Sequence, residues 1–108
     1  MELSISSEQD GSGRQILTLR GSLDMSSRSL LKQQSLVALE TPDTTGIVLD
    51  LASIEFLDSS GIGCIVEIAS DAKERDISFA LRSPSDRVIR ILTVAGLLET
   101  WKIEPAAA

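Results

Sequence analysis

Hydrophobic residues follow a strand pattern and then a helix pattern in the middle of the chain. Residues 47–51, Ile-Val-Leu-Asp-Leu, form a nearly continuous apolar run, which is typical of a central strand covered on both faces. From Ile62 onward, apolar residues recur at helical spacing, at positions 62, 65, 66, 69 and 72. We expect residues 52–57 to form a short connection. The pattern therefore predicts a buried strand that leads into an amphipathic helix.

The region before this strand is predicted to form a hairpin and a helix. Leu3 and Ile5 alternate with polar residues, and after a turn at 10–13 residues 14–20 return as a second strand in which Ile16, Leu17 and Leu19 are apolar. Gly21 is expected to end this second strand. A helix then begins with Ser26 or Ser27 as its N-cap. Its apolar side is predicted to consist of Leu30, Leu31, Val37 and Ala38.

The last third of the chain is predicted to contain a strand, a helix and a final short strand. Residues 77–81 form the first strand, and Ser83 followed by proline is a typical helix start, with Ser83 as the cap. The buried stripe of this helix is predicted to be Val88, Ile91, Leu92 and Ala95, and Gly96 ends it. Trp101 and Ile103 indicate the last strand, and residues 104–108 are expected to be a frayed tail.

Alternating strands and helices predict an α/β fold in a single domain over residues 1–108, with its core at about 3–103. The expected sheet is mixed and has four or five strands: an N-terminal antiparallel hairpin, then parallel βα units with right-handed crossovers. Loops after the carboxyl ends of parallel strands share one edge of such a sheet. We therefore expect Asp24, Asp50 and the turn at 58–61 to lie on one rim.

Composition narrows the classes of function. The net charge is −6, whereas nucleic-acid binding needs a clustered basic face, so a basic or mixed protein surface is the expected partner. No apolar run approaches the roughly 20 residues of a membrane span, which predicts no membrane insertion and a cytoplasmic location. The chain has no histidine, which removes imidazole metal ligands and Ser–His or Cys–His catalytic pairs.

The single cysteine, Cys64, excludes an internal disulfide and a multi-cysteine zinc site, and we expect it to be a small, half-buried side chain. Neither a dinucleotide loop nor a P-loop occurs, and no G-x-S-x-G elbow is present. Together with the missing histidine, these observations predict a protein that is not an enzyme and that has no cofactor and no metal.

The stretch with the most polar chemistry is Asp-Ser-Ser-Gly-Ile-Gly at 58–63, between the predicted strand and helix. Side-chain oxygens here can satisfy free N–H groups of the first helical turn, so Ser59 or Ser60 could be a plain N-cap, and Asp58 a capping carboxylate. Gly61 and Gly63 remove side-chain bulk from that turn. In the functional interpretation, Ser59 is displayed at the positive end of a helix dipole, and Asp58 orients it or accepts its proton.

These residues resemble the signature of the STAS domain, and more narrowly that of bacterial anti-sigma factor antagonists. The Gly-Ser-Leu-Asp stretch at 21–24 is similar to the G-x-L-D turn of the family, and residues 88–92 with Gly96-Leu97 are similar to its third helix and the loop after it. The resemblance covers roughly residues 3 to 103, and the Asp-Ser-Ser-Gly-Ile-Gly stretch is its most specific part.

The resemblance implies that Ser59 is phosphorylated by a partner kinase. The unphosphorylated protein would bind a GHKL-type serine kinase that is also an anti-sigma factor, thereby releasing the sigma factor, and a PP2C-type phosphatase would restore the active form. Asp24 would border the kinase-docking surface. The implied partner-binding residues are Asp24, Asp58, Ser59, Ser60, Gly61, Ile62 and Gly63.

Two other functions are compatible with the sequence. The chain could be a constitutive STAS subunit of a larger assembly, such as a stressosome-like complex or a lipid-transport ABC system, in which the 58–61 turn is a contact surface whatever its phosphorylation state. Alternatively, a nucleotide or another small ligand could bind directly at the strand-end rim, although no phosphate loop supports this.

Overall fold

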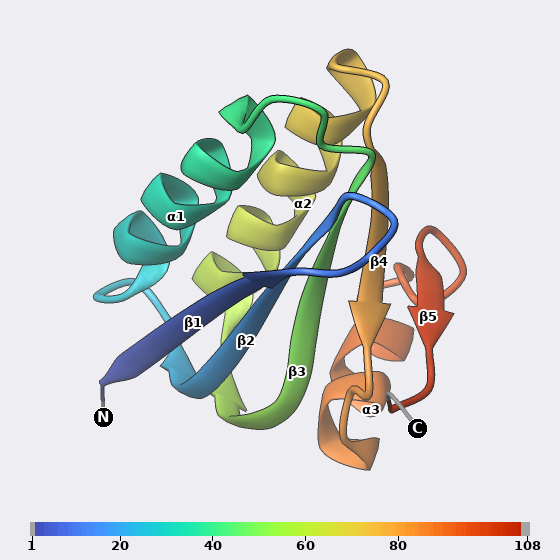
Figure 1. The fold of residues 1–108 in the computed structure, drawn as a ribbon. Helices are drawn as coiled ribbons and strands as arrows, with labels where there is room; N and C mark the ends of the chain where they lie inside the picture. Colours follow the sequence, from blue (N-terminus) through green and yellow to red (C-terminus); the bar gives the residue numbers. More distant parts are fainter. Residues whose placement is uncertain (1, 107–108) are drawn as a thin grey trace.

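Five strands form one mixed sheet in the order β1-β2-β3-β4-β5 in the computed structural model, which describes residues 2–106 (Figure 1). The strands are β1 (Leu3–Gln9), β2 (Arg14–Leu23), β3 (Gly46–Leu57), β4 (Ser78–Arg82) and β5 (Lys102–Glu104). The helices are α1 (Arg28–Glu40), α2 (Ser59–Glu74) and α3 (Asp86–Val94). β1 and β2 pair in an antiparallel manner and all other neighbours are parallel, which confirms the predicted fold class.

β2 and β3 are longer than the hydrophobic pattern predicted. β2 continues through Gly21, where a Cβ atom would meet the carbonyl oxygen of Glu2 at 2.0 Å, and β3 includes residues 52–57. The prediction that 52–57 is a connection was wrong. β4 ends opposite Asp50, so the later part of β3 has only β2 beside it, and the exposed Ala52, Glu55 and Phe56 interrupt its buried apolar run.

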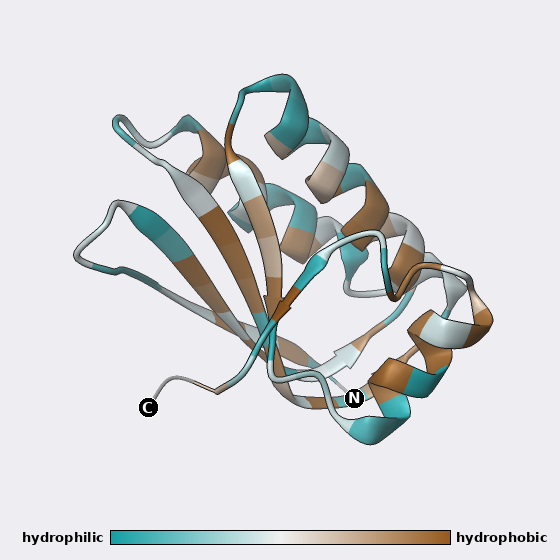
Figure 2. Ribbon diagram, turned by 90° about the vertical axis from the view of Figure 1, so that its right-hand side faces the viewer, coloured by the Kyte–Doolittle hydropathy of each residue, from teal (hydrophilic) through white to brown (hydrophobic). Residues whose placement is uncertain are grey.

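The main core lies between one face of the sheet and the adjacent helices α1 and α2 (Figure 1). Apolar residues, brown in Figure 2, lie along the strands and on the helices. α2 buries Gly61, Cys64, Ile65, Ile68 and Ala72, and α1 buries Leu31, Ser35, Ala38 and Leu39. The helical spacing of apolar residues was predicted correctly, but the buried face of each helix is rotated from the predicted one. Leu30, Val37 and Val66, which were predicted to face the core, are exposed.

The start of α3 differs from the prediction. Its N-cap is Ser85, whose hydroxyl accepts a hydrogen bond from the Val88 N–H at 3.2 Å. Ser83 lies three residues before the first residue of α3, and its N–H donates to the Glu104 carbonyl at 2.9 Å, so it belongs to the end of the sheet rather than to the helix. Within the predicted stripe, Val88 and Leu92 are buried, Ile91 is half-buried, and Ala95, the C-cap residue, is exposed.

The opposite face of the sheet carries a second, smaller buried cluster of Ile16, Val48 and Ala80. Arg14 on β2 contacts Glu104 on β5 at 2.7 Å, although β3 and β4 lie between these strands in the sheet. The ion pair therefore extends over the face that carries the cluster. Glu104 belongs to a strand and is ion-paired, so its assignment to a frayed tail was wrong; residues 107–108 of that tail lie outside the described residues.

Replacing Glu104 with Gln is expected to lower the free energy of unfolding by about 1 kcal/mol at pH 7, because Arg14 loses a charged, partly buried partner. Burial alone would raise the pKa of Glu104, but the hydrogen bond and charge of Arg14 and the charges of Lys102 and Arg82 outweigh it and lower this pKa. Because the pKa of Glu104 is lower in the folded than in the unfolded protein, the carboxylate contributes fully to the free energy of unfolding above its ordinary pKa of 4.5. This contribution is lost as the pH falls through the pKa of the folded protein.

Urea unfolding of the wild type and of Glu104→Gln at several pH values tests the contribution of Glu104 to stability. Glu99→Gln is the control for loss of an exposed charge. The difference in stability between the wild type and Glu104→Gln should narrow as the pH falls below 4.5. A constant difference down to low pH would contradict the assigned role of the ion pair.

Candidate functional site

The ends of β2 and β3 bring two distant segments of the chain together. Leu23 lies opposite Leu57, and the Asp58 N–H donates a hydrogen bond to the Leu23 carbonyl at 3.4 Å. Asp24 and the 58–61 turn therefore follow neighbouring strand ends, as predicted. Asp50 does not share this rim: it lies within β3, seven residues before the strand ends, which corresponds to about 23 Å of extended chain.

Asp58 is the N-cap of α2. Its backbone is extended, with φ −110° and ψ −175°, and its Oδ1 accepts a hydrogen bond from the Gly61 N–H at 2.9 Å. The Asp58 carbonyl accepts the first helical bond, from the Ile62 N–H at 3.0 Å. Ser59 and Ser60 are thus the first two residues of the helix, and the alternative in which one of them is the cap was wrong. The strand ends at Leu57, which leaves the capping position to the aspartate.

Ser59 is exposed and Ser60 is half-buried. Among residues 2–106, neither the Ser59 hydroxyl nor the N–H groups of Ser59 and Ser60 make a hydrogen bond. These N–H groups are at the positive end of the dipole of a 16-residue helix, which favours negative charge in the first turn. Another protein could therefore reach the hydroxyl, and an anion carried by it would be next to favourable N–H groups.

Gly61 lets α2 begin directly against the end of β2. A Cβ atom at this position would lie 2.5 Å from the Leu23 carbonyl oxygen and 2.7 Å from Leu57 Cδ1. Gly63 differs, because a Cβ atom there would meet nothing within 4 Å. Both glycines leave the first turn without side-chain bulk, as expected, but the fold requires this only at Gly61.

Asp24 forms a tight turn beside this site. Its Oδ1 accepts hydrogen bonds from the Ser26 hydroxyl at 2.7 Å and from the Ser26 N–H at 2.9 Å. The Ser26 hydroxyl bond is the main cause that lowers the pKa of Asp24, against a smaller opposing effect of burial. Ser27, one of the two predicted N-caps, is the residue before α1, but its hydroxyl donates to the Ser22 carbonyl at 2.8 Å and accepts from the Asp24 N–H at 3.0 Å. Asp24 therefore adds a fixed negative charge to the rim.

An apolar hollow lies between Ile62 on α2 and residues of α3. It has a volume of about 380 Å³ and is lined by Ile62, Arg90, Ile91, Val94 and Ala95. Ile62 is only one helical turn beyond Ser59, and the Val94 side chain is 84% exposed. The sequence pattern placed Ile91 and Ala95 in the core, and the contribution of α3 to this surface was therefore missed. The spacing of Ile91 and Val94 was compatible with either role.

Cys64 is fully buried rather than half-buried, and burial raises the pKa of its thiol. Its Sγ donates to the Arg28 carbonyl at 3.5 Å, so it packs α2 against α1. Over the described part of the chain, there is no group of three or more Asp, Glu or Cys side chains that could hold a metal ion. No helix within residues 2–106 is both long and apolar enough to cross a membrane.

The family model of the STAS domain matches residues 6–108. The chain belongs to the STAS domain family. Among curated relatives, the anti-sigma F factor antagonist of Paenibacillus polymyxa is 29% identical over 88 residues, which cover 82% of this chain and 75% of that protein. This confirms the resemblance inferred from the Asp-Ser-Ser-Gly-Ile-Gly stretch.

Solved structures have the same fold as this STAS domain. The unphosphorylated form of the anti-sigma factor antagonist SpoIIAA superposes with a TM-score of 0.80 at 21% identity and covers 96% of this chain and 89% of its own. The phosphorylated form of SpoIIAA, a Bacillus cell fate determinant, has a TM-score of 0.75 at 20% identity, with coverages of 96% and 92%.

Proposed function

We propose that this STAS domain is an anti-sigma factor antagonist that is switched off by phosphorylation of Ser59. The observation that carries the proposal is the exposed, unbonded Ser59 hydroxyl at the start of α2, directly after the Asp58 cap. The curated relative with the name of anti-sigma F factor antagonist supports it. SpoIIAA, which has been solved with and without phosphate, supports phosphorylation as the form of control.

The unphosphorylated domain binds a GHKL-type serine kinase that also acts as an anti-sigma factor, and this binding releases the sigma factor. The contact surface consists of the Asp24 turn, the first turn of α2 and the apolar hollow beside Ile62. The hollow supplies apolar area that loses its water on binding, which stabilises the complex. The carboxylates of Asp24 and Asp58 favour a partner surface with positive charge.

Phosphoryl transfer needs only a positioned hydroxyl from this chain. The Ser59 oxygen attacks the γ-phosphorus of ATP bound to the kinase, the bond to the β-phosphate oxygen breaks, and ADP leaves. The hydroxyl proton passes to a base, for which Asp58 is one candidate, since only its Oδ1 accepts a hydrogen bond among residues 2–106. The kinase supplies the metal and the remaining groups, so this domain is a substrate rather than an enzyme.

Release follows from charge. A phosphate adds about 1.5–2 negative charges, and it would stand beside Asp58 and Asp24 on a chain whose net charge is already −6. The first turn of α2 tolerates this charge because its N–H groups face it, so the fold does not need to change. The partner surface, which fits a neutral serine, then meets repulsion and a desolvation cost. A PP2C-type phosphatase removes the phosphate and restores binding.

Ser59→Glu is expected to weaken binding to the cognate kinase at least tenfold. Ser59→Gln, whose side chain has the size of glutamate but no charge, should weaken this binding less than threefold. Isothermal titration of the purified kinase with the wild type and both variants measures this. Equal losses for Glu and Gln would mean that size rather than charge causes release. Unchanged affinity for both variants would instead favour a constitutive subunit whose contacts ignore Ser59.

A further inference from the structure

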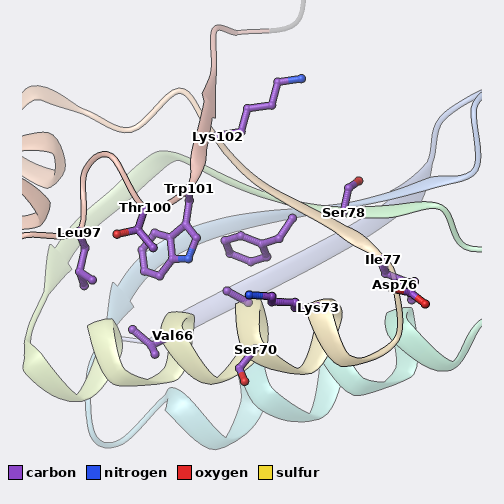
Figure 3. Close-up of a pocket in the computed structure, with 12 residues that line it drawn as sticks. Val66, Ser70, Lys73, Asp76, Ile77, Ser78, Leu97, Thr100, Trp101 and Lys102 are labelled. Carbon is purple, nitrogen blue, oxygen red and sulfur yellow. The ribbon is translucent and has the colours of Figure 1, made fainter.

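A groove at the far end of α2 is separate from the Ser59 surface. It has a volume of about 700 Å³ and lies between the second half of α2, the start of β4 and the segment that leads into β5 (Figure 3). Its apolar wall consists of Val66, Ala69, Ile77, Phe79, Leu97 and Trp101. The α2 part of the lining runs from Val66 to Lys73, which lie 7 and 14 residues after Ser59, or about 10 and 21 Å along the helix.

Two aromatic rings form the central part of the groove. Phe79 and Trp101 pack edge to face, with ring centroids 5.7 Å apart and an interplanar angle of 66°. Both side chains are only half-buried, so part of each ring remains accessible from the groove. Cavities of this size with apolar and aromatic walls are typical of small-molecule sites.

The polar groups at these rings are hydrogen-bond donors. Within residues 2–106, the Lys73 ammonium has no carboxylate at ion-pair distance and the Trp101 indole N–H has no acceptor. Figure 3 shows Lys73 on the α2 side of the groove with Trp101 across from it, whereas Lys102 extends away and Asp76 lies at the opposite end from Trp101. An apolar wall combined with two unused donors is complementary to a molecule with an apolar body and an anionic acceptor group.

We propose that this groove binds a small organic carboxylate whose apolar body packs on Phe79 and Trp101 and whose carboxylate pairs with Lys73. The Trp101 indole N–H is the second donor available to the carboxylate. Because neither Ser59 nor its neighbours in the first turn of α2 line the groove, occupancy leaves the phosphorylation site exposed. The proposal therefore does not depend on the function assigned to Ser59.

Trp101 is the only tryptophan of the chain, so its indole N–H gives a single cross-peak in a ¹H–¹⁵N NMR spectrum, and this resonance reports on the groove. We expect titration with 3-phenylpropionate to shift this resonance in a saturable manner, with an affinity at least fivefold higher than that of 3-phenylpropan-1-ol, which has the same apolar body without the charge. Lys73→Gln should remove this preference for the acid. Arg75→Gln, which loses the same charge outside the lining of the groove, should keep it.

Three results would overturn the proposal. One is an indole resonance that does not respond to the acid, and another is equal affinity for the acid and the alcohol in the wild-type protein. The third is a shift of the Trp101 resonance with protein concentration alone, since this would mean that a second copy of the chain covers the groove. Ser59→Ala should bind the acid as the wild type does, which separates failure here from failure of the phosphorylation switch.

Discussion

Ser59→Ala is expected to abolish phosphate incorporation when the protein is incubated with its cognate kinase and ATP. The variant loses the attacking oxygen but keeps the features that place the first turn of α2, namely the Asp58 cap and the close approach of Gly61 to β2. Binding to the kinase should therefore persist while labelling disappears. Phosphate transfer measured by intact mass and by radiolabel tests this directly.

Ser60→Ala and Ser26→Ala are the matched controls, because Ser60 follows Ser59 in the chain and Ser26 belongs to the Asp24 turn, and both hydroxyls differ from that of Ser59 in their surroundings. Ser60 is half-buried, and the Ser26 hydroxyl is bonded to Asp24 Oδ1 at 2.7 Å. Both variants keep the Ser59 hydroxyl and should therefore still incorporate phosphate, even where a lost contact lowers their affinity for the kinase. Residual labelling of Ser59→Ala, or its loss in Ser60→Ala, would refute the assignment of the phosphorylated residue.

Gly61→Ala is expected to lower the free energy of unfolding by about 2 kcal/mol, despite the higher helix propensity of alanine. The new methyl group would be placed 2.5 Å from a backbone oxygen of β2, and backbone cannot yield as a flexible side chain can. To relieve the contact, the start of α2 must move away from Leu23, and Ser59 moves with it. Affinity for the kinase should fall together with stability, as measured by urea unfolding and by titration.

Gly63→Ala is the control, because it adds the same methyl group two residues further along the same helix. Its Cβ atom has open space, so replacement of a helical glycine should raise the free energy of unfolding by about 0.5–1 kcal/mol. Opposite signs for the two variants would show that close approach to β2, and not glycine flexibility, accounts for Gly61. Destabilisation by both would contradict this explanation.

The order of elements and the rim with Asp24 and the 58–61 turn were predictable because both follow from local patterns and from the topology of parallel strands. The identity of the α2 cap was harder to predict. Asp, Ser and Ser all suit that position, and the choice of Asp58 depends on where β3 ends. That end is hidden in the sequence, because residues 52–57 pair on only one side and lack the apolar run of a central strand.

The phase of the helices and the contacts of the last strand could not be read from periodicity. Val66 fits the apolar period of α2 as well as Ile68 does, yet Val66 is exposed and Ile68 is buried. Glu104 looks like part of a polar tail, but Arg14, 90 residues earlier, is its partner. Such outcomes depend on tertiary neighbours, which a one-dimensional pattern does not contain.

The hydrogen bond between the Asp58 N–H and the Leu23 carbonyl joins two parts of the chain that lie far apart in sequence, with α1 and the whole of β3 between them. The surface around Ser59 is consequently not a linear motif. A nascent chain released before β3 is complete, or a proteolytic fragment with the Asp-Ser-Ser-Gly stretch alone, lacks half of the proposed recognition surface. A partner that contacts both the Asp24 turn and the first turn of α2 thereby distinguishes folded domains from incomplete ones before any phosphate is transferred.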